Sequence, residues 1–245
     1  MARKIKLTAI LAAVMMLLMT FTAHAVKPEP ATHLFLIGDS RTEMMSQAVG
    51  AGSGGIVNHW FCESGKGLGH MTDVAFPGID AGIQKILAEE PDARIRVLCM
   101  YGVNDPHNVR KYAERYNALA ERYADTEVKF YFVSVNPIAD EKSSYRYDKD
   151  IYVTTFNDVI RPLLSERVEY IDTYSKICGM FREHTRDGVH YSNDLSRQIY
   201  AMLVEAVTKD APAEKETGRE QGPGITAKTT GTIKPGFYLV HDGGY

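Results

Sequence analysis

Hydrophobic and polar residues follow two different patterns along this chain. Five short apolar segments are predicted to be strands, and several are apolar on both faces, as in a sheet that is covered on both sides. They are residues 33–37, 56–62, 95–100, 129–135 and 168–171. Between them, apolar side chains recur every three or four residues, which predicts amphipathic helices. These segments are residues 79–87, 109–123, 152–163 and 195–206, and Pro162 is expected to bend the third helix.

The order of these elements predicts an α/β protein. Strands that alternate with helices form a mostly parallel sheet with helices on both faces. In such sheets ligands bind beyond the carboxyl ends of the strands. Three polar motifs each follow a predicted strand: Gly-Asp-Ser at residues 38–40, Ser-Gly at residues 64–65 and Gly-Val-Asn-Asp at residues 102–105. All three are therefore expected at one edge of the sheet.

The two ends of the chain differ from its centre. Residues 1–25 combine a positively charged start, an apolar stretch and a final Ala-His-Ala, which predicts a cleaved secretory signal peptide. A retained membrane anchor is the alternative, but the apolar stretch is short for a span of about 20 residues. Residues 210–245 are polar and are predicted to be a flexible tail. We therefore expect an exported protein with one domain over residues 26–209 and no stable membrane span after cleavage.

Composition narrows the classes of protein. The 245 residues are 44% hydrophobic and 24% charged, which fits one large globular domain. The net charge of -3 gives no indication of a nucleic-acid partner, and composition is silent on oligomeric state. Cys62, Cys99 and Cys178 are an odd number, so at least one is unpaired within the chain. Three cysteines are too few for a disulfide scaffold.

Ser40 is the candidate nucleophile. A serine hydroxyl attacks poorly near neutral pH unless a base lies within hydrogen-bonding distance. A turn from strand to helix would expose this hydroxyl and direct backbone N–H groups of the first helical turn towards a developing oxyanion. The alternative is a purely structural role, because Asp39 and Ser40 both suit a helix N-cap.

His190 is the candidate base, and Asp187 is its candidate partner. Imidazole titrates near neutrality, so it can accept the serine proton and later deliver it to the leaving group. A nearby carboxylate fixes the tautomer and stabilises the imidazolium. The alternative is a polar surface loop before a helix that is capped by one of residues 192–194. Asp172, which also follows a predicted strand, is a rival for the acid.

The oxyanion donors are predicted from two loops. Asn104 supplies a side-chain amide, although Asn-Asp-Pro at residues 104–106 is also strong turn chemistry. Gly65 supplies a backbone N–H, and Gly67 competes for that role.

Residues 50–55 fit the pattern Gly-x-Gly-x-x-Gly, but they precede a predicted strand and are interpreted as a loop. The histidines and cysteines show no zinc-ligand spacing.

Together the four motifs resemble those of the SGNH hydrolases, also called the GDSL esterase/lipase family, and they occur in the family's order. Residues 38–40 are similar to the block with the nucleophile, and residues 64–65 to the block with the oxyanion glycine. Residues 102–105 are similar to the block with the oxyanion asparagine, and residues 187–190 to the block with the acid and the base. The resemblance covers residues 33–205.

This resemblance implies a flavodoxin-like three-layer α/β/α sandwich with a five-stranded parallel sheet. It also implies a serine acyl-enzyme mechanism that needs no metal and no cofactor, with Ser40, Gly65 and Asn104 as the oxyanion hole. The chain departs from the family where Arg41 and Thr42 follow the serine, since the family name expects leucine there. Arg41 is interpreted as an exposed helical residue, with a cationic site mouth as the alternative.

The predicted function is that of an exported serine esterase that removes a small acyl group from a carbohydrate or cell-envelope polymer. A lipid esterase or lysophospholipase, or an acyltransferase, is the alternative on the same site. A non-catalytic glycan-binding module is the alternative from another class, and the intact set of motifs argues against it.

Overall fold

A five-stranded parallel sheet forms the centre of the described chain. The computed structural model describes residues 29–144 and 149–209, so the predicted signal peptide and tail lie outside the described residues. The strands are β1 (Thr32–Gly38), β2 (Ile56–Cys62), β3 (Arg94–Met100), β4 (Lys129–Val133) and β5 (Val168–Ile171). They are arranged in the order β2-β1-β3-β4-β5, and every pair is parallel. The predicted α/β sandwich with five parallel strands is confirmed.

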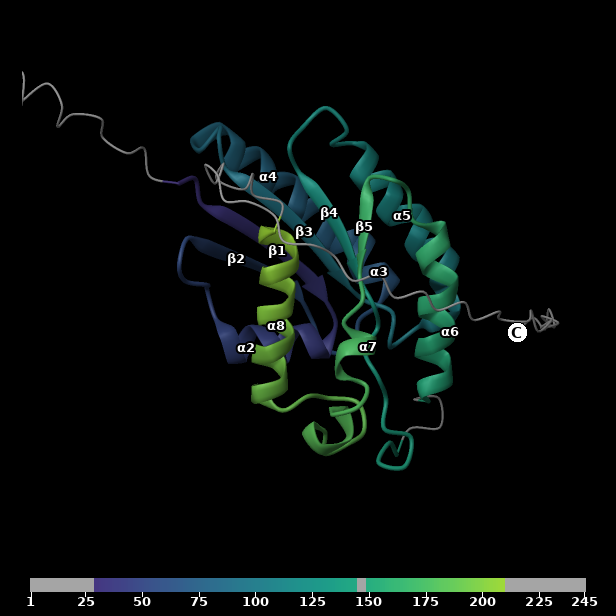
Figure 1. Cartoon of the computed structure of the whole chain (residues 1–245). Helices are drawn as coiled ribbons and strands as arrows, with labels where there is room; N and C mark the ends of the chain where they lie inside the picture. Colours follow the sequence, from purple (N-terminus) through teal and green to yellow (C-terminus); the bar gives the residue numbers. More distant parts are fainter. Residues whose placement is uncertain (1–28, 145–148, 210–245) are drawn as a thin grey trace, which may run out of the picture. The chain divides into compact units, whose positions relative to one another are not determined.

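Helices cover both faces of this sheet (Figure 1). The longer ones are α2 (Ser40–Val49), α4 (Phe76–Glu89), α5 (Val109–Glu121), α6 (Asp150–Ile160) and α8 (Asn193–Thr208), with the short α3 (Leu68–His70) and α7 (Tyr174–Ile177) between them. Phe35 and Ile37 of β1 belong to the core under α4, α5 and α6. Leu34 and Leu36 belong to the core under α2 and α8. Alternate residues of one buried strand thus serve two separate hydrophobic layers, which explains its continuous apolar sequence.

Two predicted elements are shorter than their sequence pattern. The segment 129–135 leaves the sheet after Val133, because the Asn157 side chain binds both the N–H and the C=O of Val135. The third predicted helix ends at Ile160 and continues as one 3-10 turn, Arg161–Leu163, which contains Pro162. Proline lacks the N–H and clashes with the preceding turn, so the α-helical pattern stops there.

Cys62, Cys99 and Cys178 are all free, and Cys99 is buried at the end of β3 as a small apolar residue. None of the helices within residues 29–144 and 149–209 is both long and apolar enough to cross a membrane.

A pair of histidines near the start of the sheet makes folding stability depend on pH. His33 Nδ1 and His59 Nε2 are 3.0 Å apart, and the His59 ring stacks on Phe35. Burial and the neighbouring His33 lower the pKa of His59 below its usual 6.5. The unfolded chain therefore takes up a proton at His59 more readily than the folded chain, and stability falls as pH drops through the unfolded pKa.

We expect His59→Gln to lose less stability than the wild type between about pH 7.5 and about pH 5.5. Thermal unfolding at the two pH values measures this difference. His107→Gln, at an exposed histidine, is the control and should show the wild-type dependence. Equal pH dependence of the wild type and His59→Gln would contradict this account.

Candidate active site

The turn after β1 positions Ser40. β1 ends at Gly38, and α2 begins at Ser40. Asp39 is the N-cap of α2, because its carboxylate accepts the N–H of Arg41 at 3.0 Å. A side chain at Gly38 would place its Cβ 1.8 Å from the Thr42 hydroxyl, so only glycine allows the helix to turn back over the strand end. Since Asp39 caps the helix, the Ser40 hydroxyl is available for another partner.

That partner is His190. Its Nε2 lies 2.8 Å from the Ser40 Oγ, and its Nδ1 lies 2.6 Å from Asp187 Oδ2. The other Asp187 oxygen accepts the backbone N–H groups of Val189 and His190 at 2.9 and 2.8 Å. The structure therefore brings the three residues predicted for proton transfer into one hydrogen-bonded line across 150 positions of sequence.

The electrostatics of this line favour an ionised Asp187. Partial burial of the carboxyl opposes ionisation, but the hydrogen bonds from the His190 ring and from two backbone N–H groups outweigh it and lower the pKa of Asp187 to about 2. Asp39 behaves in the opposite way, because burial raises the pKa of its carboxyl to about 6 although Arg41 favours the charged form. Asp187 therefore stays charged at neutral pH and can stabilise an imidazolium at His190.

The structure also shows what the other polar residues considered for this region contact. Ser192 caps α8 by accepting the N–H of Leu195, so the predicted helix cap is present just after Asp187 and His190. The Asp172 carboxylate accepts the N–H and the hydroxyl of Ser175 at 2.9 and 2.7 Å, while Asp187 binds His190. At Gly188, φ is +81° and a Cβ would lie 2.5 Å from the Ala139 carbonyl oxygen, so the tight turn before His190 requires glycine.

The loops after β2 and β3 contact each other through the predicted oxyanion residues. Asn104 is exposed, and its amide donates one hydrogen bond to the Lys66 carbonyl at 2.8 Å. A side-chain amide has two N–H donors, so the second remains for a ligand. A Cβ at Gly67 would lie 2.6 Å from the Asp105 carboxylate, which gives that glycine a packing role. Gly65 has a φ of +74° and open space around it, so it stays the candidate for a backbone donor.

Asp105 holds these two loops together. Its carboxylate accepts the N–H of Leu68 at 3.0 Å, the amide of Asn108 at 3.2 Å and the hydroxyl of Tyr112 at 2.6 Å. The loop that carries Gly65 is thus fixed to the loop that carries Asn104. Sequence reasoning treated Asp105 only as a turn residue, and its position beside Asn104 was the one available signal.

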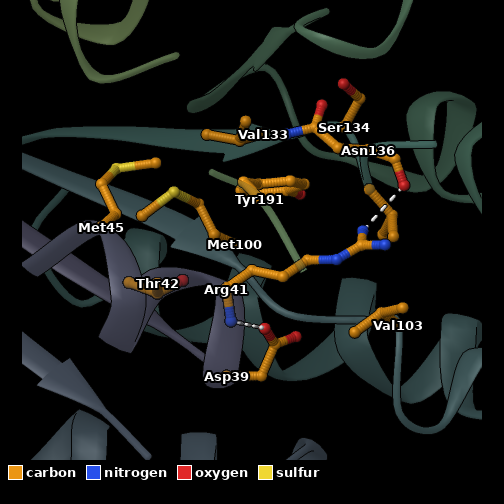
Figure 2. A pocket seen from close by; sticks show the side chains of 11 residues that line it. Asp39, Arg41, Thr42, Met45, Met100, Val103, Val133, Ser134, Asn136 and Tyr191 are labelled. Atoms are coloured by element: carbon orange, nitrogen blue, oxygen red, sulfur yellow. Dashed lines mark hydrogen bonds between the residues drawn. The ribbon is translucent and has the colours of Figure 1, made fainter. Parts of the chain in front are cut away.

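Arg41 lies inside the protein, so its interpretation as an exposed helical residue is wrong. The side chain is 4% exposed, and its guanidinium donates to three backbone carbonyl groups. It passes under the ring of Tyr191 beside a small cavity of about 20 Å³ (Figure 2). The alternative of a cationic site mouth is not what the structure shows either, because these carbonyl groups face the guanidinium.

Two surface grooves are lined in part by predicted site residues, the first by Asp187 and His190 and the second by Asn104. The first, of about 540 Å³, is lined mostly by polar side chains, including Glu183, His184, Asp187, His190 and Asp194. The second, of about 520 Å³, begins at Asn104 and is mostly apolar; Val103, Pro106, Val109, Tyr152, Phe156 and Val159 line it.

Within residues 29–144 and 149–209, no cluster of three His, Cys, Asp or Glu side chains has the geometry of a metal site.

Comparisons with known proteins agree with this architecture. No family model matches the chain, and no curated protein matches its sequence. A solved structure from Streptococcus pneumonia, described as a candidate platelet activating factor, is 20% identical with a TM-score of 0.54; the match covers 75% of this chain and 86% of the other. A candidate acylhydrolase from Bacteroides fragilis is 13% identical with a TM-score of 0.52, over 76% and 92% of the two chains. The chain has the SGNH hydrolase fold. Within that fold, the four predicted motifs meet at the carboxyl ends of β1, β2 and β3 and in the loop before α8.

We expect Asp105→Ala to weaken both the fold and the site. The substitution leaves the Leu68 N–H and the Tyr112 hydroxyl without an acceptor, a cost of about 1–3 kcal/mol. This corresponds to a fall in Tm of about 2–4 °C per kcal/mol. Labelling of Ser40 by a fluorophosphonate should also slow by about tenfold, because the loops that carry Gly65 and Asn104 lose their connection.

Asp80→Ala is the matched control for this experiment. Asp80 lies on α4 and accepts hydrogen bonds from Arg122 and from the Tyr123 hydroxyl, just after the end of α5, so it offers a similar carboxylate elsewhere in the fold. The control should lower Tm without slowing the labelling. Wild-type labelling in Asp105→Ala would show that this carboxylate does not position the oxyanion donors.

Proposed function

We propose that this chain is an exported serine esterase. The observation that carries the proposal is the hydrogen-bonded line from the Ser40 hydroxyl through His190 to Asp187. An activated serine needs a base within hydrogen-bonding distance and a third group that orients the base, and these three side chains meet both conditions. The fold shared with the acylhydrolase candidate from Bacteroides fragilis supports the same class of reaction.

The reaction follows from this geometry. The Ser40 Oγ bonds to the acyl carbon while its proton passes to His190 Nε2. The oxygen of the tetrahedral intermediate accepts hydrogen bonds from the Ser40 N–H, the Gly65 N–H and the Asn104 amide. His190 then returns the proton to the departing alcohol, which leaves an ester on Ser40. Water attacks this ester in a second round with the same proton transfers, and the acid and free Ser40 are released.

The proposed substrate is a small acyl group on a carbohydrate or on a cell-envelope polymer. Because His190 protonates the leaving alcohol, the alcohol lies on the His190 side, where the polar groove is. Carboxylate, imidazole and hydroxyl side chains in that groove offer hydrogen-bond partners for a polyhydroxylated alcohol. Export, predicted from residues 1–25, would bring the enzyme to the extracytoplasmic side, where such polymers occur. A sugar hydroxyl in place of water would make the same site an acyltransferase.

The apolar groove favours a second candidate, an esterase for longer acyl chains such as those of lipids. This groove begins at Asn104, the proposed side-chain donor to the oxyanion, and continues between Pro106, Val109 and α6. An alkyl chain that leaves the acyl carbon on this side would bury its methylene groups there at a gain of about 0.8 kcal/mol each.

The nucleophile is tested by covalent labelling of the mature protein. We expect a fluorophosphonate to label the wild type at one site and Ser40→Ala at none. Turnover of short-chain esters should fall by about 10⁴-fold or more in Ser40→Ala, because the other residues cannot form the acyl-enzyme. Ser46→Ala, on the same helix, is the control and should behave as the wild type. The absence of both labelling and turnover in the wild type would contradict the proposed function. Full activity in Ser40→Ala would contradict it as well.

The acyl group is tested by a series of aryl esters from acetyl to decanoyl. A small-acyl enzyme should show its highest kcat/KM with the acetyl ester, and Val159→Trp, which fills the apolar groove, should change no rate by more than about twofold. A preference for longer chains that Val159→Trp removes would instead establish the second candidate. Val74→Trp, at an exposed residue outside this groove, is the control.

A further inference from the structure

Arg41 is the residue next to the proposed nucleophile, and its side chain is directed into the protein. It lies in the first turn of α2, and 4% of its surface is exposed. A buried cation is costly unless hydrogen bonds compensate it, so such a residue needs a reason for its place. Since Ser40 and Arg41 share one helical turn, whatever the guanidinium binds is held at a fixed position relative to the Ser40 hydroxyl.

The guanidinium joins two separate segments to this helical turn. Its Nε donates to the Val189 carbonyl at 2.9 Å. Its Nη1 and Nη2 donate to the carbonyl groups of Asn136 and Pro137, after β4, at 2.8 and 3.0 Å. The planar fork of donors can satisfy three carbonyl groups at once, which a shorter polar or an apolar side chain cannot do.

Both sequence neighbours of His190 touch Arg41. Val189, the preceding residue, accepts the hydrogen bond from Nε. Tyr191, the following residue, places its ring 5.1 Å from the guanidinium carbon, and Figure 2 shows this ring lying over the Arg41 side chain. Arg41 thus holds the backbone on either side of the imidazole.

We propose that Arg41 is a positioning residue that keeps the His190 loop in line with the Ser40 hydroxyl. This inference rests on the proposed function, because the alignment matters for catalysis only if Ser40 and His190 carry out the reaction. Arg41 acts through His190 and does not contact the substrate.

The His190 loop is exposed, which explains why hydrogen bonds from Arg41 are useful for holding it in position. The His190 and Asp187 side chains are 33% and 49% exposed, so burial of the functional groups themselves does little to fix them. The loop is also held by the hydrogen bond from the Ala139 N–H to the Gly188 carbonyl at 2.8 Å. That bond ties the loop to the segment after β4, and Arg41 ties both of these to the nucleophile. A displacement of about 1 Å at a reacting group can cost about 100-fold in rate.

The test compares Arg41→Leu and Arg41→Lys with Arg96→Leu. Arg96 is also buried, at 6% exposure, and donates to the Ile95 carbonyl in β3, so its loss controls for the removal of a buried arginine. Two readouts are needed: kcat and KM for a short-chain ester, and hydrogen exchange of the backbone amides at residues 184–192 in the full mature chain.

For Arg41→Leu we expect kcat to fall by about 100-fold while KM stays within about threefold, because ground-state binding of the ester is not affected. Exchange at residues 184–192 should accelerate by about tenfold. Arg41→Lys keeps the charge and part of the hydrogen bonding, so its kcat should fall by only about tenfold. Arg96→Leu should lower Tm but leave kcat and the exchange of this segment at the wild-type values.

The proposal would be overturned if Arg41→Lys and Arg41→Leu both had the same kcat as the wild type and the same rate of hydrogen exchange at residues 184–192. So would equal losses of kcat in Arg96→Leu and Arg41→Leu, since Arg41 would then act only through global stability. If the wild type neither turns over esters nor reacts with a fluorophosphonate, the proposed function is wrong, while hydrogen exchange still decides whether Arg41 holds the loop. The two failures are thus distinguishable.

Discussion

The parallel register of β1 between β2 and β3 is the constraint on which the site depends. Gly38, at the end of β1, pairs with Cys62 of β2 and with Met100 of β3, so three strands end at the same level of the sheet. The next few residues of each strand must then turn away at one edge. This register brings the segments of Ser40, Gly65 and Asn104 to one place without any long loop.

Polar groups inside this edge fix what the sheet register alone leaves free. Asp105 connects the loops after β2 and β3, and Arg41 connects the first turn of α2 to the loop of His190. Arg41 is buried and Asp105 is half-buried, and each forms several hydrogen bonds that compensate its partial removal from water. The cost of burying Arg41 is consistent with a site in which the alignment of side chains matters more than the stability of a single contact.

The fold was largely predictable because hydrophobic periodicity is a local signal. The apolar run of β1 and the helical spacing in α8 follow directly from how many faces each element buries. The end of β4 was not predictable, because it depends on Asn157, whose amide replaces a strand partner at Val135 from 22 residues away. In the site, the meeting of Ser40, His190 and Asp187 was predicted from motif order, and the structure brings them within hydrogen-bonding distance. The burial of Arg41 was not predictable, since its carbonyl acceptors follow β4 and precede His190, far away in sequence.

In the proposed mechanism His190 activates Ser40 to form an acyl-enzyme, and rapid-quench kinetics with an activated aryl ester measure this step. The account predicts a burst of released phenol equivalent to one active site, with the acyl group recovered on the peptide that contains Ser40. It also predicts that His190→Ala abolishes this burst while the fold is retained. An acyl group on another residue, or a burst of unchanged size without His190, would contradict the account.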